Sequence, residues 1–479
     1  MGQSEFDPGF AAFGGGSSGT VLHPLVLAGI ILIGVLMFLL PRKYVVIPLF
    51  LGLLIFPFGQ NVYIAGVHLY ATRILISFGL VRMVLAKFSS QDKIVPGGLG
   101  ILDKLFLVWA IFRVVAVFLL YRQWGPMPNQ FSFLWGALGG YFLFRWLIRD
   151  TDDVVRLLKV FAVVAVVAAS GMLIERIFRF NLFGILGGVR SFPEVRNGRV
   201  RATGMFQHAL LAGAFGPLMF PLFLWLWKRG KSFLFGIAGA TSCVFMVLAA
   251  STSTNLMALI GGILAIFMWP IRGWMRFVRW GIVIGMLGLQ LVMKAPVWFV
   301  LQYVDLTGGS SGWERANLID NFLRHIGSWW LYGTHDNVNW GWDMWDIANQ
   351  FVAEGEGGGL ICLLVFIAMI VVCFRRLAAA RKSVAADKKE EWLFWLFDAA
   401  LFAQIMVYFG VSYYDQMAFV WYSLLVMIWV VTLAPSTVAV PVPNPNLYRV
   451  PVLGVRQEAL AEAGRGTRVY NAPSKLVGR

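Results

Sequence analysis

The stretch GGGLICLLVFIAMIVVCF, residues 357–374, decides the fold because it is long, strongly apolar and free of charge. An uninterrupted apolar run of this length predicts a helix that crosses a membrane. Similar runs recur along the 479 residues, of which 59% are hydrophobic and 13% are charged, and the mean hydropathy is +0.74. Soluble domains do not reach these values. The sequence therefore predicts an all-α integral membrane protein.

Apolar runs on either side of this stretch predict a polytopic bundle of about 12–13 transmembrane helices. The chain then divides into a flexible tail at 1–20, a membrane domain at 21–434 and a disordered, Pro-rich cytoplasmic tail at 435–479. The expected spans are residues 21–40, 44–58, 64–86, 102–121, 130–148, 155–177, 205–227, 232–250, 254–270, 278–295, 357–374, 392–411 and 415–434.

The net charge of +16 arises mainly from Lys and Arg in the turns between spans. It therefore does not indicate a nucleic-acid partner. Lys and Arg gather on alternate turns between the expected spans, and such turns face the cytoplasm. The long loops 178–204 and 296–356 then lie on the outer face, in contact with membrane lipids. The three cysteines show no spacing typical of a metal site or disulfide framework. The basic turns are Arg42-Lys43, Lys87 with Lys93, Arg145 with Arg149, 228–231, 272–279 and 375–389.

Between residues 190 and 201, loop 178–204 carries four arginines on the side of the membrane where positive charge is normally avoided. Guanidinium groups hold phosphate or diphosphate through bidentate hydrogen bonds and keep their charge at low dielectric. Arg201 adjoins the next span and is the strongest candidate phosphate ligand. Arg190, Arg196 and Arg199 fit equally well as contacts to anionic lipid head groups.

Loop 296–356 is dense in Trp, Gly, Asp and Asn, which predicts a folded segment. Aromatic faces beside carboxylates and amides suit sugars, because a pyranose offers C–H faces for stacking and hydroxyls for hydrogen bonds. Trp313, Trp342 and Asn349 are candidate glycan or acceptor contacts. An aromatic belt at the membrane interface would account for about half of the tryptophans, but it does not explain the acidic residues beside them.

Three patches of this sequence resemble the O-antigen ligase and O-antigen polymerase superfamily. They are RATGMFQHALLAG at 201–213, SSGWERANLIDNFLRHIGSWWLYGT at 310–334 and ANQFVAEGEGGGLICLLVF at 348–366. Ligases of that family have His-Asn, nine residues and Gly-x-x-Gly, where this chain has Ala348-Asn349, nine residues and Gly359-x-x-Cys362. Ala209-Leu210 also replaces a Pro-Asn pair. These departures favour a polymerase or a divergent branch over a standard ligase.

The resemblance implies a glycosyltransferase of the bacterial inner membrane with its large loop on the periplasmic side. Its substrates would be a polyprenyl-diphosphate-linked oligosaccharide and a glycan or lipid acceptor, with a polysaccharide export system as a partner. Such a transfer needs cations at the leaving diphosphate and a base near the acceptor hydroxyl. By family position, Arg201 and Arg315 fit the cation role. No metal or cofactor is expected, although Asp343-x-x-Asp346 resembles a metal motif.

Sequence alone leaves several candidates for the base, of which His335, Asp346 and Glu354 are the foremost. Arg73 and Arg113 fall within expected spans, where an unpaired charge costs several kcal/mol. They line the diphosphate cavity, form buried pairs with groups such as Glu175 and Asp398, or snorkel toward the membrane surface. His208 is interpreted as a packed core or interface residue.

Two functions from other classes also fit a membrane protein of this composition. One is a transporter or flippase for lipid-linked oligosaccharide, which the two arginines within spans favour. The absence of an internal repeat speaks against it. The other is a structural subunit whose Trp-rich loop binds a partner.

Overall fold

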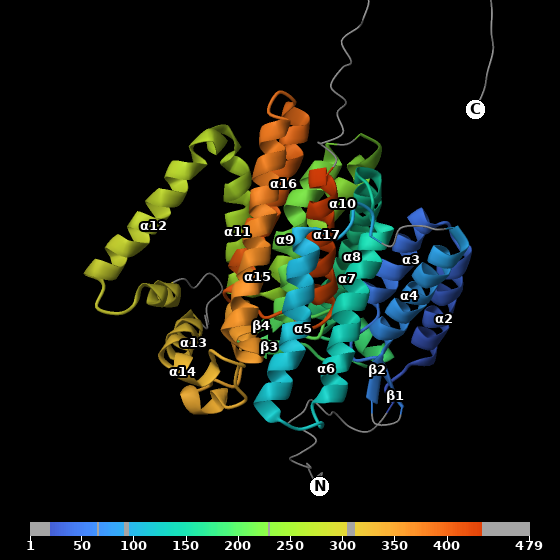
Figure 1. Ribbon diagram of the computed structural model, residues 1–479, viewed down its shortest axis with the longest axis horizontal. Helices are drawn as coiled ribbons and strands as arrows, with labels where there is room; N and C mark the ends of the chain where they lie inside the picture. The colour runs from blue at the N-terminus through green and yellow to red at the C-terminus, as the bar shows by residue number, and fades with distance from the viewer. Residues whose placement is uncertain (1–19, 65–66, 91–94, 229, 304–311, 434–479) are drawn as a thin grey trace, which may run out of the picture. The chain divides into compact units, whose positions relative to one another are not determined.

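The computed structural model describes residues 20–64, 67–90, 95–228, 230–303 and 312–433, and these are helical almost throughout. Figure 1 shows the helices gathered side by side in a bundle, as expected for an all-α membrane protein. The predicted N-terminal tail lies outside the described residues except for Thr20, and the predicted tail at 435–479 lies outside them completely.

Every predicted span corresponds to helical structure, with one span divided among three segments. The span at 130–148 consists of α6, a π-helical segment at Trp135–Gly139 and α7. The helices are α2 (Pro24–Leu39), α3 (Arg42–Ile55), α4 (Ala71–Ser90), α5 (Ile101–Tyr121), α6 (Met127–Leu134), α7 (Gly140–Leu147), α8 (Thr151–Phe178), α9 (Ala209–Trp227), α10 (Phe233–Ala250), α11 (Ser253–Phe267), α12 (Met275–Val292), α13 (Gly312–Arg324), α14 (Ile326–Trp329), α15 (Gln350–Ser383), α16 (Lys388–Tyr408) and α17 (Gln416–Leu433).

Within the described residues, eight helical segments are long and apolar enough to cross a membrane, fewer than the predicted 12–13. The remaining apolar helices α2 and α11 are shorter. The eight segments are Ile101–Tyr121, Thr151–Phe178, Ala209–Trp227, Gly230–Ala250, Trp269–Val292, Gln350–Ser383, Lys388–Tyr408 and Gln416–Leu433.

The prediction of a span at 64–86 is wrong at its beginning, because the first residues of that range belong to a β-hairpin. Strands β1 (Asn61–Ile64) and β2 (Val67–Tyr70) pair antiparallel, and α4 begins only at Ala71. Arg73 therefore lies in the first turn of α4 and not in the middle of a span. There it donates a hydrogen bond to the carbonyl oxygen of His68 (2.9 Å), and its guanidinium lies 4.7 Å from the centre of the Tyr70 ring.

Helix α15 is longer than the predicted span 357–374 at both ends. It begins at Gln350 because the side chain of Asn349 accepts hydrogen bonds from the N–H groups of Phe351 and Val352. It runs on to Ser383, so much of the basic segment 375–389 is helical and not a turn. Ala, Leu, Arg and Lys dominate these residues and favour a helix.

The helical course of α15 is interrupted at Gly359, where φ is +70°. A Cβ atom at this position would lie 2.6 Å from the carbonyl oxygen of Leu331, so the close passage of that backbone requires glycine. The N–H of the next residue, Leu360, donates to the carbonyl oxygen of Trp330 (2.8 Å). The Gly-rich segment thus joins α15 to the loop that follows α14.

The core of the bundle surrounds α9, whose side chains are buried almost all the way round. It packs against α8, α10, α11 and α16. Gly216 permits the close approach of α10, since a Cβ there would lie 2.6 Å from Val247. In contrast, α12 contains no buried residue and lies apart from the other helices in Figure 1.

The segment between α12 and α15 has a small apolar core of its own. Phe322 of α13 stacks on Trp329 of α14 with ring centres 3.9 Å apart. The cluster consists of Leu318, Phe322, Trp329, Trp340, Met344 and Val352. Residues of this loop between 312 and 349 are thus packed around apolar side chains of their own.

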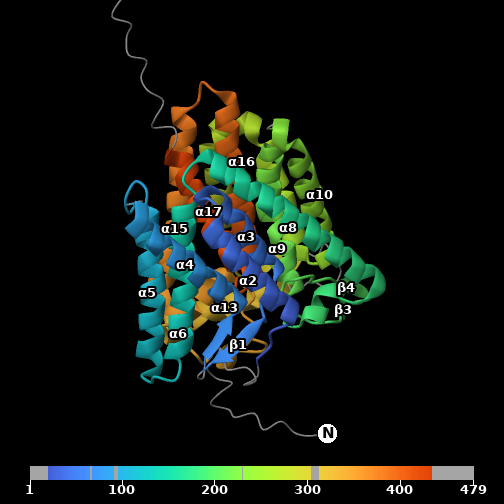
Figure 2. The same ribbon diagram turned by 90° about the vertical axis from the view of Figure 1, so that its right-hand side faces the viewer.

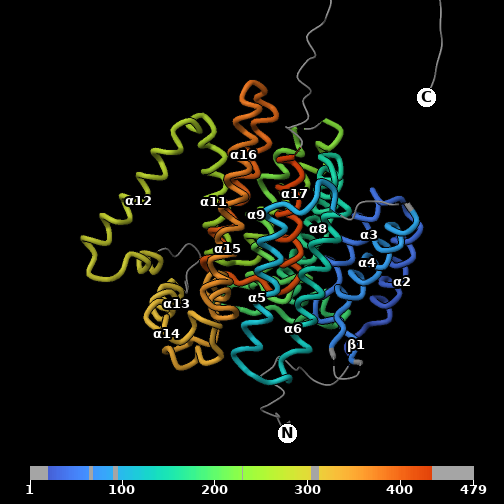
Figure 3. The backbone as a smooth tube through the Cα atoms, in the orientation of Figure 1, coloured from blue at the N-terminus to red at the C-terminus, as the bar shows by residue number. Residues whose placement is uncertain are grey.

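The two loops predicted to lie on the outer face meet at one end of the bundle. Figures 1 and 2 show the hairpin of β3 (Glu194–Arg196) and β4 (Arg199–Arg201) at the same end as α13, and the tube in Figure 3 shows α13 and α14 side by side there. The turn between α15 and α16 lies at the opposite end in Figure 1. The side of the membrane that each end faces remains a sequence-based prediction.

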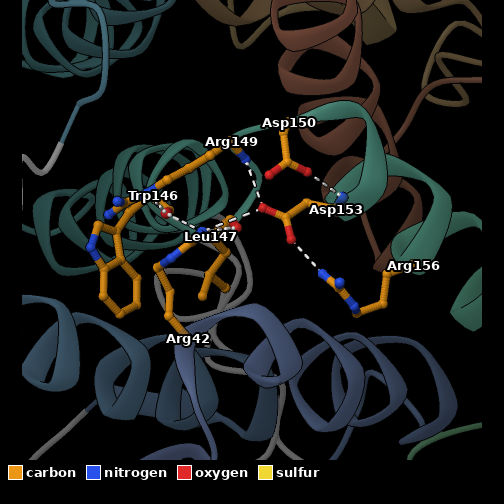
Figure 4. Close-up of polar contacts among 7 residues, drawn as sticks. All are labelled: Arg42, Trp146, Leu147, Arg149, Asp150, Asp153 and Arg156. Atoms are coloured by element: carbon orange, nitrogen blue, oxygen red, sulfur yellow. Dashed lines mark hydrogen bonds and ion pairs between the residues drawn. The ribbon is translucent and has the colours of Figure 1, made fainter.

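A polar cluster joins α3 to the turn between α7 and α8, one of the turns predicted to be cytoplasmic (Figure 4). Asp153 accepts hydrogen bonds from Arg42 (3.4 Å), from the backbone N–H of Arg149 (3.1 Å) and from Arg156. Arg42 also donates to the carbonyl oxygen of Leu147 (2.7 Å). These contacts satisfy the buried carboxylate and fix the start of α8.

Candidate functional site

The hairpin of β3 and β4 gives the site its first arginine. Its two-residue turn is Asn197-Gly198, with φ of +50° and +74°, as a tight type I′ turn requires. The register places Glu194 directly opposite Arg201, so their side chains lie on the same face. Arg201 Nη1 donates to Glu194 Oε1 over 3.0 Å.

The segment that follows β4 is held from two sides by buried carboxylates. Glu175 of α8 accepts hydrogen bonds from the N–H groups of Thr203 (2.9 Å) and Gly204 (2.8 Å). Asp415, just before α17, accepts from the N–H of Gln207 (3.1 Å), and burial raises its pKa to about 6. Both carboxylates bond mainly to backbone, so their effect is to fix the path of the chain between Arg201 and α9.

Helix α13 supplies the second arginine, Arg315. Its side chain passes so close to Gly410 that a Cβ atom there would lie 2.8 Å from Arg315 Nε. The pKa of Arg315 is lowered to about 10, mainly by burial; the charges of Arg201 and Arg196 also lower it, whereas Glu314 and Asp346 oppose this effect. The guanidinium nevertheless remains charged at neutral pH.

Arg201 and Arg315 line one pocket of about 170 Å³. This volume is smaller than a typical ligand cavity of about 300 Å³ or more and suits a compact group such as a phosphate. Three guanidinium groups and four carboxylates meet in the pocket. The lining residues are Glu194, Arg196, Arg201, His208, Leu210, Glu314, Arg315, Leu318, Asp343, Asp346 and Ala348.

Both arginines carry buried donors that the protein does not satisfy. The Nε atoms of Arg201 and Arg315 are buried and have no hydrogen-bond partner among the described residues. Leaving a buried donor of a charged group unpaired is costly, so these atoms need an explanation. An anionic ligand in the pocket would supply the missing acceptors.

Of the predicted catalytic residues, Asp346 lies in this pocket. Its side chain is exposed, and no side-chain hydrogen bond or ion pair joins it to another described residue. Asp343 lines the same pocket and adopts a left-handed backbone conformation with φ of +59°. The pocket therefore brings together two predicted diphosphate ligands and one predicted base.

The predicted glycan contacts Trp313 and Trp342 form an exposed aromatic pair with ring centres 6.2 Å apart. Each directly precedes a residue that lines the pocket, Glu314 and Asp343 respectively. The third predicted contact, Asn349, is buried and caps α15, and its amide also donates to the carbonyl oxygen of Phe409 (3.3 Å).

Two other predicted site residues, Arg113 and Glu354, bind each other away from the pocket. Glu354 Oε2 accepts hydrogen bonds from Arg113 Nη1 (3.2 Å) and from Trp109 Nε1 (2.7 Å), and Oε1 accepts from Gln350 (2.7 Å). We name Trp109, Arg113, Gln350 and Glu354 the α5–α15 cluster. The buried pair anticipated for Arg113 thus exists, with Glu354 in place of Glu175 or Asp398.

His335 and Arg73 also lie outside the pocket lining. His335 is exposed, and its ring centre lies 5.3 Å from that of Tyr121 on α5. Arg73 is at the start of α4, with the contacts described above. The structure therefore does not place these two residues with Arg201 and Arg315.

Sequence reasoning missed Glu194 and underrated His208, although a signal for the first was present. The sequence Val195-Arg-Asn-Gly-Arg-Val200 alternates around Asn-Gly, which predicts a hairpin and the pairing of Glu194 with Arg201. His208 caps α9 and lines the pocket, so it is not simply a packed core residue. Ala348, which occupies the position of the family histidine, lines the same pocket.

In the described part of the chain, no three His, Cys, Asp or Glu side chains are grouped as ligands for a metal ion. A scan against protein-family models finds no match to this chain, and a search of the curated proteins finds no significant match. The resemblance to the O-antigen superfamily therefore depends on the quoted residues.

Proposed function

We propose that this protein is a membrane glycosyltransferase that polymerises polyprenyl-diphosphate-linked glycan units at the outer face of a bacterial inner membrane. The main support is the convergence of Arg201 and Arg315, which come from distant segments, line one pocket and each keep a buried Nε donor without a partner among the described residues. The exposed pair of Trp313 and Trp342 beside the pocket adds a surface suited to sugar rings.

The proposed reaction uses both signs of charge in the pocket. The acceptor hydroxyl attacks the anomeric carbon, a new C–O bond forms, and the bond from that carbon to the diphosphate oxygen breaks. The leaving polyprenyl diphosphate takes the electron pair, and Arg201 and Arg315 stabilise its growing negative charge. Asp346 accepts the proton of the acceptor hydroxyl, since its carboxylate is exposed in the same pocket.

The test is the electrophoretic ladder of surface and lipid-linked glycan from the native host. The gene is deleted and then replaced by wild type, Arg315→Ala or Arg315→Lys. Loss of the ladder with single units left on the carrier is expected for the deletion and for both variants. Lysine keeps the charge but lacks the planar fork that binds two phosphate oxygens.

Arg324→Ala is the matched control, because Arg324 lies on the same helix as Arg315. It is exposed and pairs with Asp320 within α13 (2.6 Å). Its partner Asp320 is buried, but Arg324 does not line the pocket, so the ladder should be restored when the variant protein is present in the membrane. If the Arg315 variants and Arg324→Ala all fail to restore the ladder while their proteins are present in the membrane, the loss is not specific to the pocket. That result would contradict its proposed role.

The same ladder separates the alternatives. Long polymer that stays on the carrier without reaching its acceptor would indicate ligase-type transfer to a lipid or protein. Single units confined to the inner leaflet would indicate a flippase. An unchanged ladder after deletion would contradict the glycosyltransferase proposal.

A further inference from the structure

His208 lines the same pocket as Arg201 and Arg315, and its Nε2 atom lies on the side of Glu194, another lining residue. It is the N-cap residue of α9, and its Nδ1 accepts a hydrogen bond from the backbone N–H of Leu210 over 3.2 Å. Glu194 Oε2 is 3.9 Å from Nε2, beyond hydrogen-bonding distance. Among the described residues, no acceptor bonds to Nε2.

The cap determines which nitrogen carries the proton. An Nδ1 atom that accepts a hydrogen bond has no hydrogen of its own, so in the neutral ring the hydrogen is on Nε2. Protonation of Nδ1 would also break the cap and leave a helix N–H unsatisfied. Nε2 is therefore a donor and not a base.

The charges around His208 also favour the neutral ring. Burial lowers its pKa, and Arg201 and the more distant Arg190 lower it further, against the opposing effect of Glu194 and Asp346. The imidazole is thus uncharged at neutral pH and carries its hydrogen at Nε2.

We infer that His208 is a third ligand of the anionic substrate group, a neutral Nε2–H donor that its helix cap fixes in one tautomer. This inference rests on the proposed function, because the anion is taken to be the diphosphate of the lipid-linked glycan. It also gives Ala348 a different meaning. The chain has a histidine in the pocket, but this one is built to bind the leaving group and cannot take the acceptor proton at Nε2.

A second capping histidine provides a matched control. His23 is the N-cap of α2, and its Nδ1 accepts from the N–H of Leu25 over 3.2 Å, the same distance as at His208. His23 does not line the pocket. Asparagine is a good N-cap but is too short to replace the Nε2 donor. His208→Asn and His23→Asn therefore both keep a cap, and only the first removes a pocket donor.

The experiment is calorimetric titration of inorganic diphosphate into the full-length protein in detergent. His208→Asn should weaken binding about tenfold or more, the effect of a hydrogen bond to a charged group, and His23→Asn should leave it unchanged. His208→Gln restores a donor of similar reach and should recover most of the affinity. The ratio of wild-type to His208→Asn affinity should stay constant from about pH 7 to 8, because a ring whose pKa lies below its ordinary value of 6.5 stays neutral there.

The inference is overturned if His208→Asn binds diphosphate as wild type does, or if the affinity ratio falls steeply as the pH rises, which would indicate an imidazolium. Arg201→Ala and Arg315→Ala distinguish this failure from failure of the proposed function. If they abolish binding while His208→Asn does not, only the role of His208 is wrong. If wild type itself fails to bind diphosphate, both proposals fall.

Discussion

The pocket and the α5–α15 cluster each join arginines to carboxylates from distant parts of the chain, yet they differ in how their hydrogen bonds are satisfied. In the α5–α15 cluster, Glu354 accepts from three donors, and Arg113 is its ion-pair partner. In the pocket, Arg201 and Arg315 each leave a buried Nε donor unpaired. A satisfied cluster stabilises the fold by itself, whereas an unsatisfied one gains its partners from a ligand.

This difference separates residues to which the sequence analysis assigned the same role. Arg113 and Arg201 are both predicted diphosphate ligands, and Glu354 and Asp346 are both predicted bases. Their surroundings divide them into one pair that holds α5 to α15 and another, Arg201 and Asp346, that lines the pocket. The following experiments test that division, from the largest expected effect to the smallest.

Asp346→Asn should have the largest effect, a loss of about 10²- to 10⁴-fold in the rate of glycan transfer, the range for removal of a general base. The amide is nearly the same size and should leave folding unchanged. The rate is measured with lipid-linked repeat units in isolated membranes. Asp336→Asn, an exposed change in the same loop region, is the control and should keep full activity. Full activity of Asp346→Asn would assign the base to another group.

Arg113→Met should destabilise the protein by about 3–5 kcal/mol, because it leaves the charge of Glu354 buried without its cation. Thermal unfolding in detergent and the amount of folded protein in the membrane are the measurements. The double variant Arg113→Met with Glu354→Gln removes that charge and should recover much of the loss. A stable Arg113→Met protein without activity would show that the α5–α15 cluster also handles substrate, which would break the contrast.

Trp342→Ala should raise the KM for the glycan about fivefold, since stacking contributes roughly 1 kcal/mol per aromatic pair, and should change kcat little. The comparison is Trp345→Ala, an equally exposed tryptophan three residues further on. Equal effects of the two substitutions would mean that general membrane contact, and not the pair with Trp313, underlies the change.

Asp415→Asn is the last test, and its effect is confined to a narrow pH range, where it changes how stability depends on pH. The pKa of Asp415 is raised to about 6 in the folded state from its ordinary value of 3.8. Between these values the folded state holds a proton that the unfolded state has released, so stability falls as the pH rises from about 4 to 6. Asparagine should flatten this slope in thermal unfolding curves. An unchanged slope would mean that other carboxylates govern it.

The helical bundle was predictable because long apolar runs have few alternatives to a membrane helix. The β1–β2 hairpin was not predictable, since residues 61–70 adjoin an apolar run in the sequence. Their pairing depends on tertiary contacts. Buried Gln60 illustrates this, because its amide donates to the carbonyl oxygens of Leu186 (2.6 Å) and Gly187 (2.7 Å), more than a hundred residues away.

The candidate site was predictable in its residue types but not in its grouping. Charge on the unexpected side of the membrane singled out Arg201, and the family pattern singled out Arg315. Sequence spacing could not show that Glu354 turns toward Arg113 or that His208 turns toward the pocket. Those orientations follow from the packing of α5 on α15 and from the cap of α9.

The two-residue Asn197-Gly198 turn makes the site sensitive to the length of the chain. Side chains alternate between the two faces of a strand, so a register slip of one residue would turn Arg201 away from Glu194 and the pocket. The membrane helices would tolerate an insertion in this turn, since their own packing is untouched. In homologous chains that share this chemistry, the residues of the hairpin should therefore vary while the number of residues in its turn stays constant.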